Sequence, residues 1–276
     1  MSTRVVVFPF DLFGGSAAGE GARLLADEIR EMIRDAKSET VATRARAWAG
    51  QIRLRELPFD NLAAVAGWRS QGEKQASSLL LTQDKILWLG GNHLACLPIY
   101  DCLSGTGVQV LQFDAHLDIH DFQDSIDTPS HGNFLLHAKQ PLVEIVNVGH
   151  RDLLIEQDRI NRYYQGTVSA LEIARDSRQA ADRVFALTKA RDIWIDIDCD
   201  VFDPVDFPAT GRPVPMGISP QFLFSLLEAI PAQRIKGVSL SEFDPARDNR
   251  DQCLALLTWL AEYLFLRWYE QPDRVV

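Results

Sequence analysis

The chain has 276 residues, and its 28 Lys and Arg residues stand against 38 Asp and Glu residues, which gives a formal net charge of −10. This acidic balance, with no local basic run, excludes the electrostatic footprint of a nucleic-acid-binding protein, so we expect a small partner, and a cationic one suits the charge. With 46% hydrophobic residues, the composition is that of an ordinary globular protein. Because α/β proteins of roughly 250 residues often fold as one unit, we expect a single domain over residues 1–276.

Short β-branched and apolar runs alternate with segments of helical spacing, which is typical of a parallel sheet covered by helices on both faces. In chain order we expect strand Arg4–Phe10, helix Glu20–Ala36, strand Ile52–Leu57, helix Asn61–Leu81, strand Lys85–Leu89, helix Leu94–Leu103, strands Val108–Phe113 and Val143–Val148, helix Gln179–Lys189, strand Ile193–Ile197, helix Pro220–Ala229, strand Ile235–Leu240 and helix Arg250–Trp268. The sequence therefore predicts an α/β fold, a three-layer sandwich with a mainly parallel central sheet. Two irregular segments, residues 118–133 and 202–219, exceed the usual ~2 to 6 residues of such connections, so we expect them to serve a site.

The four cysteines are widely spread and form no CxxC pair, which argues against a zinc knuckle and against a disulfide framework. The first ten residues lack the basic start and the long apolar run of a signal peptide. The most apolar helical segment, Leu254–Leu266, is shorter than the ~20 residues that cross a bilayer. We therefore expect a cytoplasmic protein that has no membrane partner.

Polar clusters follow four of the predicted strands. They are GGNH at residues 90–93, DAHLD at 114–118, DID at 196–198 and SEFD at 241–244. In parallel sheets the ligand binds beyond the carboxyl ends of the strands, so each cluster stands where a site is expected. All six histidines also fall within residues 93–150. We infer that this end of the sheet carries the chemistry.

The residue types in these clusters are those of a metal site without sulfur ligands. DAHLD puts two carboxylates and a histidine at alternate positions, which project to one side if strand geometry continues, and DID repeats the device. Such ligands suit Mn2+, Zn2+ or Fe2+. Four carboxylates gathered in a cleft of low dielectric need compensating charge, which two divalent cations would supply. The six candidate ligands are His93, Asp114, His116, Asp118, Asp196 and Asp198.

Each of these signals also has an ordinary interpretation. A lone Asp after a strand is most often a turn or cap residue, but independent caps do not explain three such clusters at successive strand ends. We interpret His137 and His150 as partly buried, hydrogen-bonded histidines and Cys199 as a packing residue. A GxSxG motif, a Walker A motif and a GxGxxG motif after the first strand are all absent. Metallophosphoesterases share DxH and GNH elements, but in the opposite order along the chain.

With these residues in view, the chain resembles the ureohydrolase family, which includes arginase, agmatinase, formimidoylglutamase and guanidinobutyrase. GGNH resembles the family's GGDH, DAHLD its DAHxD and SHGNF its HG segment. DIDCDVFDPVDFPATGRPVP is similar to the long DxDxxDPxxxPxTGxP signature, and SEFDP to the xEhNP element. The start, VFPFDLFGGSAAGEGARLLADEIRE, is similar more loosely. The resemblance implies the arginase and deacetylase fold.

Carried over position by position, the resemblance implies a site with two Mn2+ ions. One ion would be bound by His93, Asp114, Asp118 and Asp196, and the other by His116, Asp114, Asp196 and Asp198. In this assignment Asp114 and Asp196 bridge the ions, and Asp118 orients a hydroxide that attacks a guanidinium carbon.

The resemblance also implies two residues that act directly on the substrate. His131 would donate the proton that the departing amine needs, and Glu242 would accept hydrogen bonds from guanidinium N–H groups. The milder interpretations are a loop cap for His131 and a solvated strand-end carboxylate for Glu242. The implied products are urea and an amine, and the implied assembly is a homotrimer or homohexamer.

Departures from the family pattern bear on the substrate. Asn92 replaces the usual Asp beside the first His, Arg212 replaces a small Thr, and Met216 replaces a Gly. The positions at which arginases contact the amino-acid end of their substrate are His120, Asp127 and Leu154 here. We therefore expect a guanidino compound other than L-arginine, either agmatine-like or a guanidino acid. The alternatives are a formimino or amide hydrolase of the same fold and a catalytically degenerate metal-binding homologue.

Overall fold

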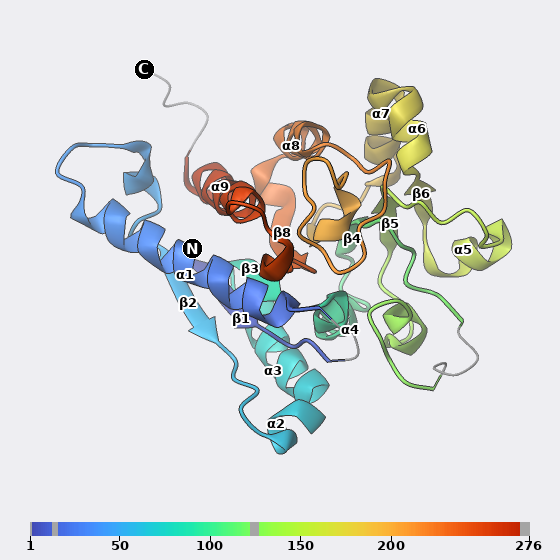
Figure 1. Ribbon diagram of the computed structural model, residues 1–276, viewed down its shortest axis with the longest axis horizontal. Coiled ribbons are helices and arrows are strands. Elements are labelled where there is room, and N and C mark those ends of the chain that lie inside the picture. The colour runs from blue at the N-terminus through green and yellow to red at the C-terminus, as the bar shows by residue number, and fades with distance from the viewer. Residues whose placement is uncertain (1, 13–15, 122–126, 271–276) are drawn as a thin grey trace.

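The computed structural model describes residues 2–12, 16–121 and 127–270, and eight strands within them form one sheet (Figure 1). The strands are β1 Thr3–Phe8, β2 Ile52–Glu56, β3 Lys85–Gly90, β4 Gln109–Phe113, β5 Ile145–Val148, β6 Gly166–Val168, β7 Ile193–Asp198 and β8 Ile235–Ser241. They lie in the order β2-β1-β3-β8-β7-β4-β5-β6, and every pair of neighbours is parallel. The predicted α/β fold is confirmed, with a sheet that is parallel throughout the described strands.

Helices cover both faces of this sheet. The helices are α1 Ala18–Ser38, α2 Leu62–Ala66, α3 Trp68–Leu80, α4 Leu97–Leu103, α5 Gln157–Tyr163, α6 Ala170–Arg175, α7 Ser177–Leu187, α8 Pro220–Ala229 and α9 Gln252–Tyr269. Because successive strand residues point to opposite faces, Val5 and Val7 of β1 join a core with α1 and α6 to α9, whereas Val6 and Phe8 join a core with α3 to α5. Helices α1 and α9 lie side by side although they come from opposite ends of the chain (Figure 1).

The sequence prediction differs from the structure in three places. Strand β6 and helices α5 and α6 were not predicted, since elements of three to seven residues are too short to show a clear period. The predicted helix 61–81 is divided into α2 and α3 at Gly67, which ends α2. The predicted helix 94–103 begins as a 3-10 helix, His93–Cys96, and continues as α4, which has Pro98 in its first turn.

The sheet brings four strands together at its centre, in the order β3, β8, β7 and β4. Since all strands are parallel, their carboxyl ends meet at one edge, and these are the strands that precede the four polar clusters. Of the two predicted irregular segments, 202–219 is closed by a bridge between Phe202 and Ile218. Residues 122–126 of the other lie outside the described residues. Among the described residues, none of the helices combines the length and apolar character that spanning a membrane requires.

Candidate metal centre

The strand ends deliver the candidate residues to one buried point. Asp114 follows β4 directly and is 0% exposed. Asp198 is the last residue of β7, and a short 3-10 helix, Cys199–Val201 (η4), continues the chain from it. His93 opens the 3-10 helix His93–Cys96 (η2) after β3 and is 1% exposed. The local fold therefore places two carboxylates and an imidazole where three strands end together.

One group of ligand atoms surrounds Nδ1 of His93. This nitrogen lies 2.8 Å from Oδ2 of Asp118. It lies 3.2 Å from Oδ2 of Asp114 and 3.2 Å from Oδ2 of Asp198. Four of the residues predicted as ligands thus converge, from β3, β4 and β7.

A second group lies on the other side of Asp114 and includes a residue that was not predicted. Nδ1 of His116 lies 2.9 Å from Oδ2 of Asp200 and 3.8 Å from Oδ1 of Asp114. Asp200 belongs to η4, and its backbone N–H donates to Oδ1 of Asp198 at 2.9 Å. The two groups of potential ligands therefore share Asp114.

Asp196, which was predicted as a bridging ligand, lies outside these two groups and forms a third potential ligand group with His93 and Cys96. Its Oδ2 lies 2.8 Å from Nε2 of His93, on the edge of the imidazole ring opposite to Nδ1. The hydroxyl of Tyr100 donates to the same oxygen at 2.6 Å, and the hydroxyl of Ser239 donates to Oδ1. Asp196 is thus placed behind His93, in a network of hydrogen bonds, rather than beside the other carboxylates.

Arg151 holds the η4 segment from behind. Its guanidinium donates to the carbonyl of Val201 at 2.8 Å and to the carbonyl of Asp200. Burial lowers the pKa of Arg151, although the charge of Asp200 acts in the opposite direction. A half-buried cation therefore stands close to the carboxylate groups, and it fixes the backbone that carries Asp200.

The electrostatics of the cluster call for further positive charge. Burial raises the pKa of Asp114 well above its usual value, and the charge of Asp118 adds a smaller increase. Burial also raises the pKa of Asp198, to which the charge of Asp200 contributes. Burial raises the pKa of Asp200, but His116 and the hydrogen bonds with Asp198 and the backbone N–H of Ala115 together lower it below its usual value. Burial thus favours the protonated forms of Asp114 and Asp198, and a cation bound beside them would favour their charged forms.

The residues present fit metal ions. Within the part of the chain that the structure describes, three buried atoms that face one another have no hydrogen-bond partner, namely Nδ1 of His93, Oδ2 of Asp114 and Oδ2 of Asp118. Unpaired buried polar atoms are costly in a folded protein, and a cation bound among them would satisfy all three. Imidazole and carboxylate donors without thiolates suit Mn2+, Zn2+ or Fe2+. The donor set and the unpaired atoms therefore agree with a metal centre.

His131 and Glu242 meet at the rim of this centre. Nδ1 of His131 lies 3.2 Å from Oε1 of Glu242, and this hydrogen bond raises the pKa of His131, whereas burial lowers it. Glu242 directly follows β8 and has a φ of +62°, and Asp118 has a φ of +47°. Residues other than glycine are strained when their backbone adopts this left-handed conformation, and such strain is typical of functional sites.

Comparison with known proteins agrees with this geometry. Residues 2–266 match the model of a protein family whose description is the Arginase family. The chain belongs to the arginase family. It is 25% identical over 181 residues to an agmatinase of Blochmanniella floridana, a match that covers 64% of this chain but only 58% of that protein. The chain thus matches less than two thirds of the length of this relative.

Solved structures of the family share the fold. The structure of a hypothetical agmatinase from Burkholderia thailandensis is similar with a TM-score of 0.79, at 19% identity, over 98% of this chain and 86% of that one. The structure of an arginase from Bacillus subtilis is similar with a TM-score of 0.76, at 20% identity, over 100% of both chains. The arginase-like fold that the sequence resemblance implied is therefore confirmed.

The family signature contains the signal that identifies Asp200. Its spacing, DxDxxDP, fits Asp198, Asp200 and the Asp203-Pro204 pair, and the PxTGxP part then falls on residues 208–213. The ligand set that the resemblance implied uses Asp196 and Asp198 at the first two Asp of this signature, two residues earlier. The structure agrees with the later register, because Asp200 contacts His116 and Asp196 does not lie in that group.

The three departures from the family pattern occupy different surroundings. Asn92 is buried, and its side-chain N–H donates to the carbonyl of Leu12 at 2.8 Å, a bond that an Asp could not donate. Arg212 is exposed, yet its charge lowers the pKa of His131, so it stands near the rim of the centre. Met216 is exposed and has a φ of +65°, in the region that favours glycine.

The remaining candidates are placed as follows. His120 lies 3.5 Å from Oδ2 of Asp152, and Leu154 is 96% exposed. His150 is buried, and burial lowers its pKa. His137 is half-buried at the end of the 3-10 helix Phe134–His137, away from the ligand groups. Cys199 is fully buried in the core, in agreement with its interpretation as a packing residue.

Proposed function

We propose that this member of the arginase family is an amidinohydrolase that holds two Mn2+ ions and cleaves a guanidino compound other than L-arginine to urea and an amine. The observation that carries the proposal is the pair of adjacent ligand groups that share Asp114 where β4 and β7 end. A pair of adjacent groups, rather than one, is the arrangement that a hydrolytic site with two ions requires.

In this proposal one ion is held by His93, Asp114, Asp118 and Asp198, and the other by Asp114, His116, Asp198 and Asp200. Asp198 then takes the shared position that the resemblance had given to Asp196. When bound, the ions supply Lewis acidity, which makes water acidic enough to act as the nucleophile at neutral pH. Their charge also allows Asp114 and Asp198 to lose the protons that burial otherwise favours.

Glu242 is the residue that we assign to the guanidinium group. Its Oε1 already accepts the backbone N–H of His93 at 2.8 Å and faces His131. Its Oε2 is the oxygen that we assign to the substrate, because a carboxylate oxygen pairs well with the planar N–H groups of a guanidinium ion. This contact would hold the guanidinium carbon at a fixed place beside the ligand groups.

His131 is the residue that we assign to proton transfer. Hydrolysis breaks the bond between the guanidinium carbon and the nitrogen of the substrate tail, and that nitrogen must gain a proton to leave as an amine. The hydrogen bond to Glu242 raises the pKa of His131 and so favours its protonated form near neutral pH. His131 can then donate this proton, and a proton from water restores it.

The rim of the centre supports a substrate without an amino-acid end. Leu154 carries no charge for an α-amino group, and His120 faces Asp152. Arg212 brings a positive charge to the rim, near His131. That charge disfavours a cationic tail and favours a carboxylate. Within the proposed class, a guanidino acid therefore fits better than agmatine.

A urea-release screen of the Mn2+-loaded protein tests this function. We expect urea from a guanidino acid such as guanidinobutyrate or guanidinopropionate, a weaker response to agmatine, and little from arginine or free guanidine. Asp114→Asn is the matched control, because it keeps the shape of the shared ligand but removes its charge, and it should be inactive. Release of formamide or of an acid without urea would indicate the formimino or amide hydrolase instead. Bound metal without any turnover would indicate a degenerate homologue.

A further inference from the structure

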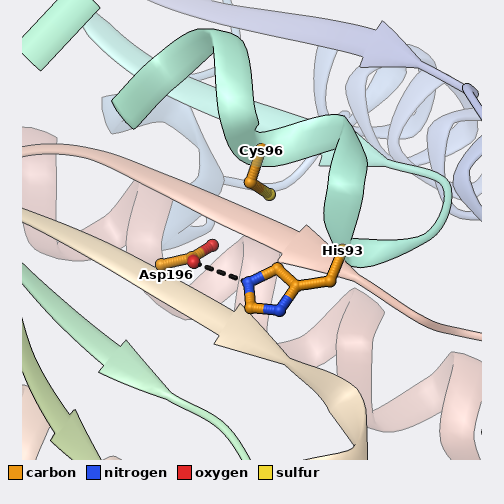
Figure 2. Close-up of side chains that lie close together, drawn as sticks. All are labelled: His93, Cys96 and Asp196. Atoms are coloured by element: carbon orange, nitrogen blue, oxygen red, sulfur yellow. Dashed lines mark hydrogen bonds and ion pairs between the residues drawn. The ribbon is translucent and has the colours of Figure 1, made fainter. Parts of the chain in front are cut away.

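A fully buried carboxylate, Asp196, lies behind His93 and is not used as a ligand by the proposed function. Figure 2 shows its carboxylate facing the imidazole of His93, with Cys96 above the pair. Asp196 lies within β7 and is 0% exposed. Its three hydrogen-bonding neighbours come from three elements: His93 from η2, Tyr100 from α4 and Ser239 from β8. Three separate elements of the fold therefore fix the position of this buried carboxylate.

The direction of these hydrogen bonds follows from their donors. The indole Nε1 of Trp194 can only donate, and it donates to the hydroxyl oxygen of Ser239 at 2.9 Å. The proton of Ser239 is therefore free to point at Oδ1 of Asp196. Tyr100 donates to Oδ2 at 2.6 Å. Asp196 thus acts as an acceptor in this network, and its contact with His93 requires the imidazole proton on Nε2.

A proton on Nε2 has a direct consequence for the other nitrogen of the ring. A histidine binds a metal ion as the neutral imidazole, in which only one nitrogen carries a proton, so with that proton on Nε2 the lone pair for the ion is on Nδ1. Nδ1 is the atom that faces Asp114, Asp118 and Asp198, and it has no hydrogen-bond partner in the described ranges 2–12, 16–121 and 127–270. The same contact also fixes the orientation of the ring. Partners of this kind commonly orient histidines that bind metal ions.

The ligand atoms of the three residues in Figure 2 lie within 4.8 Å of one another, which is close enough for a metal site of their own. The hydrogen bonds argue against that interpretation. Nε2 of His93 is engaged with Asp196 at 2.8 Å, and both oxygens of Asp196 already accept hydrogen bonds. An ion there would have to displace these donors, whereas Nδ1 of His93 and Oδ2 of Asp114 and Asp118 have no hydrogen-bond partner among the described residues.

We propose that Asp196 is a positioning residue that holds His93 with its proton on Nε2, so that Nδ1 is available to a metal ion on the opposite edge of the ring. This inference rests on the metal centre of the proposed function. It assigns Asp196 to the affinity of one ion only, the one that His93 would bind. The affinity for the ion on the side of His116 and Asp200 should not depend on Asp196.

The test is a titration of the purified, metal-free chain with Mn2+, in which the signal of free aqueous Mn2+ is followed by electron paramagnetic resonance and bound metal is counted by elemental analysis. We expect Asp196→Asn to bind two ions at saturation but to weaken one of them by about 10- to 100-fold, the range found for such partners. The other ion should stay within about threefold. Tyr100→Phe is the matched control, because it removes a donor but leaves the carboxylate on His93, and both of its affinities should stay near those of the wild type.

Several results would overturn the assignment. If Asp196→Asn binds only one ion at saturation, Asp196 is itself a ligand. Equal weakening of both ions, with a matching loss of thermal stability in the metal-free protein, shows a general structural role. Unchanged affinities show no role at all. Asp196→Ser, which is smaller, serves as a second variant with the same expected result if the amide variant fails to fold.

The readout also separates this inference from the proposed function. Wild-type protein that binds two Mn2+ ions but releases no urea from any guanidine would contradict the proposed function, while the affinities of Asp196→Asn would still decide the positioning role. Wild-type protein that binds no Mn2+ would overturn both.

Discussion

One oxygen of Glu242 joins the two functional parts of the centre. Oε1 accepts the backbone N–H of His93 at 2.8 Å, and the same atom lies 3.2 Å from Nδ1 of His131. The strand end of β8 is thereby tied both to the first candidate ligand after β3 and to the candidate proton donor. A change at Glu242 is therefore expected to alter the acidity of His131 as well as substrate binding.

The pH dependence of turnover should show this link. If protonated His131 is the acid, kcat at saturating Mn2+ falls as the pH rises through its pKa, which the hydrogen bond to Glu242 raises above the usual value. Glu242→Gln removes that charge, so the alkaline limb of the profile should move to lower pH.

Arg212 offers a control of opposite sign for this profile. Its charge lowers the pKa of His131, so Arg212→Ala should move the alkaline limb to higher pH. Profiles of kcat against pH for the wild type and both variants provide the measurement. Shifts in the same direction for the two variants would show that His131 is not the group that titrates.

His131→Ala should separate chemistry from metal binding. The imidazole contacts Glu242 and is not part of either ligand group. We expect a loss of about 100- to 10,000-fold in kcat, the usual contribution of a general acid. Elemental analysis should still find the wild-type metal content. Loss of an ion from this variant would make His131 a ligand instead.

Asp200→Asn should remove the ion on the side of His116. Asp200 contacts Nδ1 of His116, and no other carboxylate lies as close to that nitrogen in the described residues. We expect one bound Mn2+ in place of two, and urea release lower by more than ~100-fold. Asp206→Asn is the matched control in the same segment, because Asp206 is exposed, and it should keep both ions and full activity. An Asp200 variant that retains two tightly bound ions would contradict the register assigned to the signature.

Metal affinity should rise with pH. Burial lowers the pKa of His116, but the charge of Asp200 raises it, and the result is a pKa of about 10 in the metal-free protein. His116 is therefore protonated at neutral pH. A metal ion must displace that proton, which gives about a tenfold gain in affinity per pH unit for each proton released below that pKa. Calorimetric titrations between pH 6.5 and 8.5, in buffers of different ionisation enthalpy, count these protons. His116→Gln should lower the count by one, and a wild type that releases no proton would refute the argument.

Arg212 should also influence the choice of substrate. Its charge stands at the rim of the centre, exposed to solvent, so its effect on a charged tail is modest. We expect Arg212→Glu to lower kcat/KM for guanidinobutyrate by about threefold to tenfold and to raise it for agmatine by a similar factor. Equal changes for both substrates would mean that the charge of the tail is not sensed at this position.

The sheet was largely predictable from the sequence because its buried strands are continuous apolar runs. Seven of the eight strands were predicted, among them the fully buried KILWLG of β3, whereas β2, IRLRE, alternates apolar and charged residues. Strand β6 is only three residues long and offers no pattern. Helix α6 does carry a signal, since Ser169 and Glu172 form a capping box, but its six residues show no helical period.

The candidate site was predictable up to the point where a strand ends. The sequence DIDCD puts Asp196, Asp198 and Asp200 at alternate positions, and the pattern alone does not tell which pair lies at the edge of the sheet. The structure ends β7 at Asp198, so Asp196 is still flanked by strand neighbours and pairs with Ser239 of β8. Strand ends depend on tertiary contacts such as those of Arg151 with η4, which no local pattern contains.

Arg151 also bears on what happens when metal is withdrawn. Its bonds to the carbonyls of Asp200 and Val201 involve no ligand atom, so they persist without an ion. The scaffold is thus preorganised by the protein itself. Chelation should leave an intact apoprotein, and restoring Mn2+ should regenerate the holoenzyme directly, with no need for refolding.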